Sequence, residues 1–285
     1  MAAPLPRPIG VGDLRGRRVL GLFAHPDDEV LAAGLLALAA RAGAAVGVVC
    51  ATAGEAGEVR EPERFAGQAL AEVRRHELVR SCAALGAGAP VVLGLPDGDL
   101  DGLGDDALAG ALAPHLSELG PADVTVTLGL DGAYGHRDHI ALSRAASAAV
   151  AARRRECQPR LLLVEHPAGM FKRLWRTMRR VRPGLIAGAL AARDLGRQAA
   201  QVDLRVDVSD VWPAKRAAIA AHASQLVDGR PESFLTPALD AAAWAHLAAQ
   251  EWYRVAAGPA LPAGARDPFA GLSAPVAGLA APART

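Results

Sequence analysis

The predicted fold is decided by one stretch, Val19-Leu20-Gly21-Leu22-Phe23-Ala24-His25-Pro26-Asp27-Asp28-Glu29. It begins as an apolar run of strand length and then places one imidazole and two carboxylates within four residues, at His25, Asp27 and Asp28. In open α/β sheets, ligands bind outside the carboxyl ends of the strands. A buried strand that leads straight into metal-ligand side chains therefore predicts an α/β protein with its site at this strand end.

On either side of this stretch, short β-rich runs alternate with longer Ala- and Leu-rich runs, the pattern of βαβ units on a parallel sheet. The predicted strands are 18–24, 45–51, 90–95, 123–128 and 160–164, and the predicted helices are 28–42, 65–85, 106–119 and 136–155. We expect a Rossmann-like α/β fold with a mostly parallel sheet flanked by helices on both faces.

The alternation breaks after Glu165. Residues 166–200 have the composition of a lid-like insertion, and a late strand at 202–206 and helices at 211–226 and 238–256 follow. Residues 257–285 are rich in Ala, Pro and Gly without an apolar period, which predicts a mostly disordered tail. We therefore expect a single domain over residues 1–256.

Composition excludes several functional classes. Hydrophobic residues make up 51% and charged residues 21% of the 285-residue chain, a balance typical of soluble globular proteins. The formal net charge of +1 gives no electrostatic reason to expect a nucleic acid partner. Three dispersed cysteines, and no apolar segment long enough for a signal peptide or a membrane span, predict a cytoplasmic protein.

The first motif, His25 to Asp28, suits zinc chemistry. A catalytic zinc site uses three nitrogen or oxygen ligands and keeps one position for water. His25 and Asp28 can supply two of these ligands, while Asp27 points elsewhere and lies near the metal, where a general base for the bound water belongs. The alternative is that Asp27 or Asp28 only caps the following helix, with His25 a polar residue at a strand end.

The second motif, Gly132-Ala133-Tyr134-Gly135-His136-Arg137-Asp138-His139, follows the fourth predicted strand. His136 and His139 are three residues apart and share one face of a helix, so one can bind the metal while the other faces the substrate. Two histidines at this spacing are a weak signal alone. Beside the first motif, on the same sheet, they supply the missing third ligand.

In this order and spacing, the two motifs resemble the LmbE-like, or PIG-L, deacetylase family, which removes acetyl groups from N-acetylglucosamine conjugates. The resemblance covers about residues 18–227. It extends through Thr52-Ala53-Gly54-Glu55, Arg74 with Glu77, Leu95-Pro96-Asp97-Gly98, and Lys215 to Gln225.

The resemblance implies a role for each matched residue. His25, Asp28 and His139 become the ligands of Zn²⁺, with Fe²⁺ possible in a reducing cytoplasm. Asp27 becomes the general base. His136 stabilises the oxyanion, Asp138 orients the His136 ring and Tyr134 reaches the tetrahedral intermediate, while Arg74 contacts a substrate hydroxyl. One departure is Arg137, where the family usually has proline.

Other residues carry weaker signals. Glu55, Asp97 and His222 are candidate substrate contacts, but a solvated loop, a turn and a capping or core role explain them equally well. The basic segment 171–182 could bind an anionic membrane or a lipid-linked substrate, although a solvated lid is favoured.

The sequence thus predicts a metal-dependent hydrolase that releases acetate from an N-acetylglucosamine conjugate, a small-molecule partner. Three alternatives compete with this prediction: a peripheral-membrane deacetylase of a glycolipid, a non-catalytic sugar-binding module, and a magnesium phosphohydrolase that uses Asp27, Asp28 and Glu29. His25 and His139 argue against the magnesium site, and the complete set of ligands and base argues against the non-catalytic module. The oligomeric state and the sugar's aglycone stay undetermined.

Overall fold

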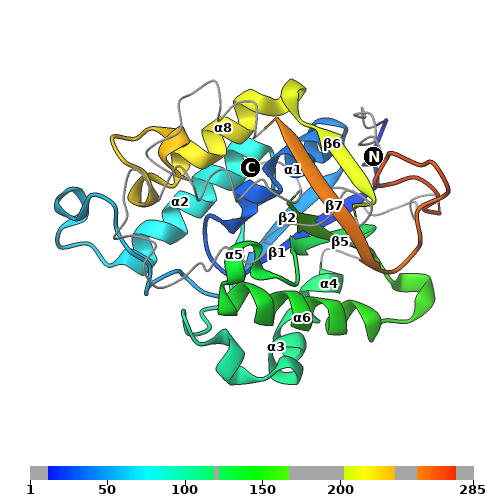
Figure 1. Ribbon diagram of the computed structural model, residues 1–285, viewed down its shortest axis with the longest axis horizontal. Coiled ribbons are helices and arrows are strands. Elements are labelled where there is room, and N and C mark those ends of the chain that lie inside the picture. Colours follow the sequence, from blue (N-terminus) through cyan, green and yellow to red (C-terminus); the bar gives the residue numbers. More distant parts are fainter. Residues whose placement is uncertain (1–11, 119–121, 167–201, 235–248, 274–285) are drawn as a thin grey trace, which may run out of the picture.

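The structure is a computed structural model that describes residues 12–118, 122–166, 202–234 and 249–273. Within these ranges, seven strands form one sheet in the order β3-β2-β1-β4-β5-β7-β6 (Figure 1). The strands are β1 (Arg18–Phe23), β2 (Ala45–Cys50), β3 (Val91–Val92), β4 (Val124–Leu128), β5 (Arg160–Glu165), β6 (Leu204–Asp207) and β7 (Gln250–Ala257). Strands β1 to β5 are parallel to one another, and β7 runs antiparallel between β5 and β6.

Helices cover both faces of this sheet (Figure 1). They are α1 (Ala33–Arg41), α2 (Leu70–Leu85), α3 (Asp105–Leu112), α4 (His115–Glu118), α5 (Gly132–Gly135), α6 (Arg137–Ala151) and α8 (Trp212–Ala221). Helices α1, α2 and α8 pack on one face, and α3, α4 and α6 pack on the other. The predicted Rossmann-like, mostly parallel α/β fold is confirmed.

The central strand β1 explains why the deciding stretch is apolar throughout. Successive side chains of a strand point to opposite faces. Val19 and Phe23 enter the core beneath α1 and α2, whereas Leu20 and Leu22 enter the core beneath α6. A strand buried on both faces needs hydrophobic residues at every position instead of an alternating pattern.

The late part of the chain departs from the prediction. The second half of the predicted helix 238–256 is β7, and residues 235–248 lie outside the described ranges. The run Trp252-Tyr253-Arg254-Val255 combines aromatic and β-branched side chains that favour a strand. Pairing with both β5 and β6 gives this run its hydrogen bonds, so the helix prediction is wrong here.

Strand β7 also anchors the first helix. Glu251 is buried, and its carboxylate accepts the Gly34 and Leu35 backbone N–H groups at 2.7 and 2.8 Å. These are amides of the first turn of α1, which have no partner within the helix. Lys215 from α8 donates to the same carboxylate at 2.6 Å.

The predicted disordered tail is wrong for residues 257–273. Phe269 is buried, and the Arg160 guanidinium donates to the carbonyls of Pro259, Ala260, Pro268 and Ala270 at 2.5–2.9 Å. A buried cation at the start of β5 thus orders a stretch whose composition alone favours disorder.

Two further predictions concern residues outside the described ranges. The lid-like insertion 166–200 and its basic segment 171–182 fall there, except for His166. None of the described helices is both long and apolar enough to cross a membrane. The cytoplasmic location stays a prediction.

Candidate metal centre

The candidate site lies at the carboxyl ends of the central strands. Residues 24–28 follow β1, residues 51–57 follow β2, residues 93–98 follow β3 and residues 129–139 follow β4. Strands β1 and β4 are neighbours from which the strand order runs in opposite directions, and such a switch point leaves a crevice for a ligand. The two predicted motifs therefore meet at one place.

Three predicted ligands converge there. His25 Nδ1 lies 3.1 Å from His139 Nε2, and the Asp28 carboxylate lies 3.1 Å from His139 Nε2 and 3.4 Å from His25 Nδ1. All three residues are buried. Two imidazole nitrogens and one carboxylate around a common point are the donor set of a mononuclear catalytic metal site.

The outer nitrogen of each ring supports this interpretation. His139 Nδ1 faces the Gly132 carbonyl at 3.1 Å, and His25 Nε2 faces Asp97 Oδ1 at 2.9 Å. These acceptors place a proton on His139 Nδ1 and His25 Nε2. The nitrogens that face each other, His139 Nε2 and His25 Nδ1, can then offer lone pairs to a cation. Metal-binding histidines are commonly oriented by acceptors in this way, so the residues present fit a divalent metal.

The backbone N–H of Asp138 bonds to His136 Nδ1 at 3.2 Å, so the predicted orienting of His136 by Asp138 stays a prediction, but the Asp138 carboxylate lies against His25. This carboxylate lies 3.2 Å from His25 Nε2 and accepts the Gly98 and Leu100 backbone N–H groups at 2.8 and 3.1 Å. His25, Asp97 and Asp138 form a second cluster with metal-ligand atoms, and His25, His136 and His139 form a third. Because backbone amides already occupy the carboxylates of Asp97 and Asp138, we assign these two residues to orienting His25.

The cluster stabilises positive charge. Burial alone lowers the pKa of His25, but hydrogen bonds to Asp138, Asp28 and Asp97 outweigh burial and raise it to about 12. Burial raises the pKa of Asp28, yet the neighbouring His139 and His25 bring it well below its ordinary value. An ionised carboxylate here attracts a cation, whether a proton or a metal ion.

Asp27 has an unusual backbone. Its φ of 120° and ψ of −20° are strained for a residue with a side chain, at a cost of about 1–3 kcal/mol. Its carboxylate lies 2.8 Å from the Arg74 guanidinium. Burial raises the pKa of Asp27 and the charge of Asp28 raises it further, although Arg74 opposes both. A raised pKa makes Asp27 a better proton acceptor than an ordinary aspartate.

His136 lies beside the cluster as the residue that precedes α6. Its Nδ1 accepts the Asp138 backbone N–H at 3.2 Å, and its ring stacks on His139 with 4.5 Å between centroids. Burial lowers the pKa of His136, and the nearby His139 and His25 lower it further. A lowered pKa favours the neutral ring, and with Nδ1 as an acceptor the Nε2 atom can carry the proton and donate a hydrogen bond.

The predicted substrate contacts differ in their exposure. Arg74 is 4% exposed and donates to the carbonyls of Gly54 and Pro26 at 2.8 and 2.5 Å. The Asp97 side chain is mostly covered, and its second oxygen accepts the Ala56 N–H at 2.8 Å. Both residues hold the walls of the site and present little surface to a sugar.

Of the other two, only Glu55 remains on the rim. It is exposed, and its carboxylate accepts the Asp97 N–H at 3.1 Å, so its contact with substrate stays a prediction. His222 has no exposed surface, and its Nε2 lies 2.6 Å from Glu29. We therefore place His222 behind the site and not against the substrate. Tyr134 lies in α5, but its side chain is outside the described part.

Glu29 has contacts that the sequence pattern did not predict. This carboxylate accepts the Asp27 backbone N–H at 2.9 Å and the Ser81 hydroxyl at 2.5 Å, away from the cluster. A magnesium site built from Asp27, Asp28 and Glu29 is thereby contradicted. The available signal was position: Glu29 lies in the first turn of the 3-10 helix Asp28–Leu31, where a carboxylate can accept backbone amides.

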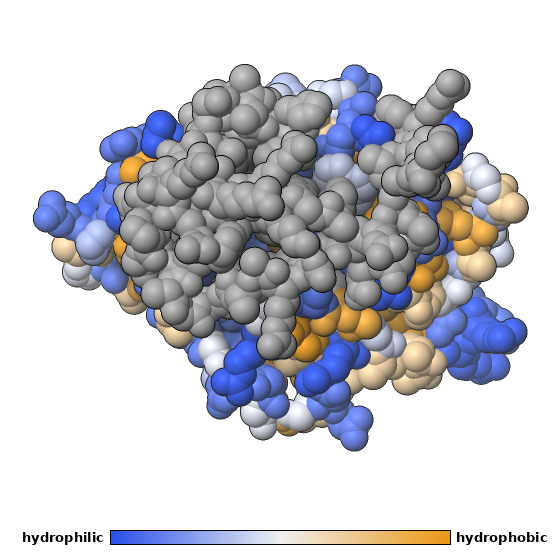
Figure 2. Space-filling view, viewed as in Figure 1, coloured by the Kyte–Doolittle hydropathy of each residue, from blue (hydrophilic) through white to orange (hydrophobic). Residues whose placement is uncertain are grey.

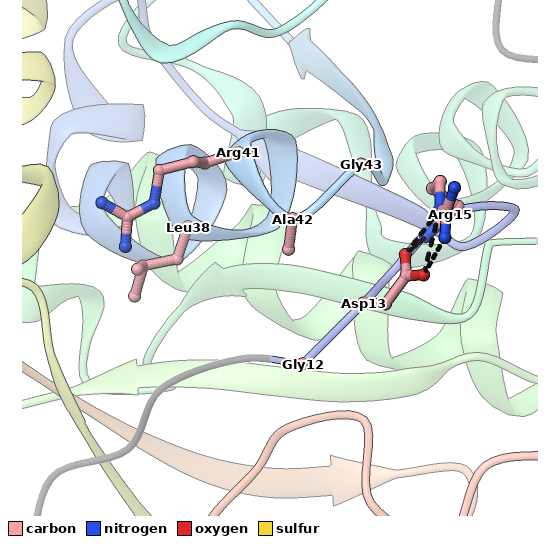
Figure 3. Close-up of a pocket in the computed structure, with 7 residues that line it drawn as sticks. All are labelled: Gly12, Asp13, Arg15, Leu38, Arg41, Ala42 and Gly43. Carbon is pink, nitrogen blue, oxygen red and sulfur yellow. Dashed lines mark hydrogen bonds and ion pairs between the residues drawn. The ribbon is translucent and has the colours of Figure 1, made fainter.

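A separate hollow lies near the amino ends of β1 and β2, at the opposite end of the strands from the candidate site (Figure 3). It is lined by residues that precede β1 and by the end of α1, namely Gly12, Asp13, Arg15, Leu38, Arg41, Ala42 and Gly43. Arg15 pairs with Asp13, and Arg41 donates to the Asp210 carbonyl. The hollow shares no residue with the histidine cluster, and its cations are already paired.

Fold and site together define a class: an α/β protein whose topological switch point carries a buried His/Asp cluster that could hold a metal ion. The family described as "PIG-L: GlcNAc-PI de-N-acetylase" matches residues 20–150. A protein of Nakamurella multipartita named 1D-myo-inositol 2-acetamido-2-deoxy-alpha-D-glucopyranoside deacetylase is 36% identical over 276 residues, covering 87% of this chain and 92% of the relative. A protein of the same name from a Mycobacterium species is 37% identical, covering 73% and 74%.

The chain belongs to the PIG-L family. The predicted family is confirmed, and with it the class of enzyme, a hydrolase of the deacetylase type.

Solved structures agree on the fold. An N,N'-diacetylchitobiose deacetylase from Pyrococcus horikoshii superposes with a TM-score of 0.55 at 22% identity, covering 84% of this chain and 83% of that one. A 4-carboxy-2-hydroxymuconate hydratase from Pseudomonas putida superposes nearly as well, with a TM-score of 0.53 at 19% identity over 86% and 98%. Because these two proteins catalyse different reactions, the shared fold alone does not determine the chemistry.

Proposed function

We propose that this chain hydrolyses the acetamide of an N-acetylglucosamine conjugate and releases acetate and a free amino sugar. The observation that carries the proposal is the convergence of His25 Nδ1, His139 Nε2 and the Asp28 carboxylate within 3.1–3.4 Å, with Asp27 adjacent. The named relatives support an inositol-linked sugar as the first candidate substrate.

The donor set supports Zn²⁺ as the cofactor, with Fe²⁺ as the second candidate. Imidazole nitrogen suits both metals, whereas Mg²⁺ prefers oxygen ligands and retains its waters. When bound, a divalent metal would lower the pKa of a coordinated water and polarise the acetamide carbonyl. His25, Asp28 and His139 would hold the metal.

The residues around this centre divide the proton chemistry. Asp27, held by Arg74, accepts a proton from the attacking water and returns it to the departing amine. His136, neutral with its proton on Nε2, donates a hydrogen bond to the oxyanion of the tetrahedral intermediate. Loss of one such donor typically costs roughly 10²–10³ in kcat.

The other candidate functions have less support. A non-catalytic sugar-binding module would not need a complete set of metal ligands and base, yet all four residues are in place. A peripheral enzyme acting on a lipid-linked sugar depends on residues 171–182, which the described structure does not include.

A substrate panel tests the proposal. Acetate and free-amine release would be measured with N-acetylglucosamine, its inositol and malate conjugates, diacetylchitobiose and an N-acetylglucosaminyl lipid. We expect release that stops on chelation, returns with Zn²⁺ and prefers the inositol conjugate. Preference for the lipid would favour a peripheral enzyme that acts on a lipid-linked sugar. No release from any substrate by metal-loaded protein would overturn the proposed function.

A further inference from the structure

The backbone of Asp27 is held by a residue with no contact to the metal cluster. At φ 120°, Asp27 adopts a conformation that side-chain-bearing residues rarely take. This backbone turn points the two adjacent carboxylates in different directions: Asp28 faces the histidines, and Asp27 faces Arg74. Such a conformation persists only where the surroundings fix it.

Glu29 supplies that constraint on the amide side. One of its oxygens accepts the Asp27 N–H at 2.9 Å. The other accepts the Ser81 hydroxyl at 2.5 Å and faces His222 Nε2 at 2.6 Å. Ser81 belongs to α2 and His222 follows α8, so Glu29 ties the Asp27 turn to two elements outside the motif.

Both oxygens of the Glu29 carboxylate are bound to buried groups. Glu29, Ser81 and His222 are all 0% exposed, and no oxygen of Glu29 faces the cluster or solvent. On the other side of the same turn, Arg74 grips the Asp27 carboxylate and the Pro26 carbonyl. Asp27 is therefore fixed through both its amide and its side chain.

We propose that Glu29 is a positioning residue that keeps Asp27 in its strained conformation and so aims the general base. The inference rests on the proposed hydrolysis. It assigns to Glu29 no proton transfer, no metal contact and no need for its negative charge. What matters is an acceptor at the Asp27 N–H that is itself anchored to α2 and α8.

Two substitutions separate this role from a charge-dependent one. In Glu29→Gln, the carbonyl oxygen can still accept the Asp27 N–H, while the amide group faces the Ser81 hydroxyl and His222 Nε2 in its neutral tautomer. In Glu29→Ala, the acceptor is lost. We expect kcat to fall about 100-fold in Glu29→Ala, the effect of a misplacement of about 1 Å, and to stay within about fivefold in Glu29→Gln.

Substrate KM and Zn²⁺ affinity should change less than threefold in both variants, because the metal ligands and the rim are untouched. Asp123→Ala is the matched control. Asp123 is likewise a carboxylate that accepts a backbone N–H, that of Arg18 at 2.8 Å, but it directly precedes β4 and so lies at the amino ends of the strands, away from the Asp27 turn. It should lower thermal stability and leave kcat unchanged below the unfolding transition.

Clear outcomes overturn the inference. Glu29→Gln as impaired as Glu29→Ala would show that the charge matters, and a parallel loss of Zn²⁺ affinity would show that Glu29 acts on the cluster. If Glu29→Ala does not fold, Ser81→Ala removes one anchor and should lower kcat several-fold without changing KM; an unchanged kcat contradicts the inference.

A structural readout is independent of the reaction. If the wild-type protein hydrolyses none of the substrates, the proposed function fails, but crystal structures of the two variants still test the positioning. Asp27 should keep a φ near 120° in Glu29→Gln and relax to a negative φ in Glu29→Ala. The same φ in both structures would overturn the inference.

Discussion

Two buried arginines, Arg160 and Arg74, lie at opposite ends of the strands, and their hydrogen-bond partners differ. Arg160, at the amino end of β5, donates to four backbone carbonyls and has no carboxylate partner within the described ranges. Arg74, over the carboxyl ends, shares its guanidinium between two carbonyls and the Asp27 carboxylate.

The surroundings of the two side chains differ in the same way. Burial lowers the pKa of Arg160, whereas the charges of Asp27, Asp28, Asp97 and Glu77 outweigh burial and raise the pKa of Arg74. Arg74 Nε and His222 Nδ1 are two of six buried side-chain atoms without a hydrogen-bond partner among the described residues. Arg160, which bonds to backbone carbonyls, stabilises the fold, whereas Arg74 lies among the concentrated charges of the candidate site.

Substitution of Asp27, at the carboxyl ends of the strands, should give the largest effect on kcat. We expect Asp27→Asn to lower kcat by roughly 10²–10⁴-fold, because an amide cannot accept the proton. Because the pKa of Asp27 is raised, its ionised form is disfavoured by folding. Chelated Asp27→Asn should thus be at least as stable as chelated wild type at pH 7.

Steady-state kinetics and urea unfolding check both halves of this prediction. Asp207→Asn, which alters a carboxylate on β6 that bonds to Ser209, is the control and should keep wild-type kcat. A strongly destabilised Asp27→Asn would contradict the contrast between the two ends.

Substitution of Arg160, at the amino end of β5, should lower stability and leave kcat unchanged. Arg160→Met leaves four carbonyls without their donor and should lower the free energy of unfolding by about 3–5 kcal/mol. Below the transition, kcat should match wild type, because Arg160 lies at the far end of its strand from the site. A loss of kcat in protein that is fully folded by circular dichroism would argue against this separation.

The contrast also marks how far sequence reasoning could go. The apolar run of β1 and the position of His25 and Asp28 follow from local rules, because a strand buried on both faces and the residues after it are visible in the sequence. The convergence with His139 needed only the parallel order of β1 and β4.

Long-range partners set what local rules could not predict. Strand β7 depends on β5 and β6, and the order of residues 258–273 depends on Arg160, about a hundred residues earlier. The Asp138 carboxylate lies against His25, where it also accepts the Gly98 and Leu100 backbone N–H groups, and these partners are distant in the sequence. Likewise, His222 lies behind the site, where its Nε2 contacts Glu29.

A pH effect should come next in size. His166, after β5, has its pKa lowered to about 4, mainly because burial disfavours its charge. The unfolded chain, with a pKa near 6.5, binds this proton first, so stability is full above pH 6.5 and falls as the pH drops towards 4. The loss attributable to His166 is about 3 kcal/mol at pH 4.

Unfolding of wild type and His166→Gln from pH 7.5 to 4 measures this effect. The free energy of wild type should fall more steeply through this window than that of the variant. Parallel curves would mean that His166 does not stay neutral in the fold.

The smallest effect is expected at Arg137, on the rim. Its side chain is 76% exposed, and its guanidinium pairs with Asp101. Exposed ion pairs contribute about 0–1 kcal/mol. Arg137 is the first residue of α6, where proline is well tolerated. The preceding His136 has φ −66° and ψ 127°, the conformation that a following proline favours. Arg137→Pro should therefore change stability by less than about 1 kcal/mol and kcat by less than threefold, as measured by urea unfolding and acetate release. A tenfold loss in kcat/KM with unchanged stability would instead place this cation against the substrate.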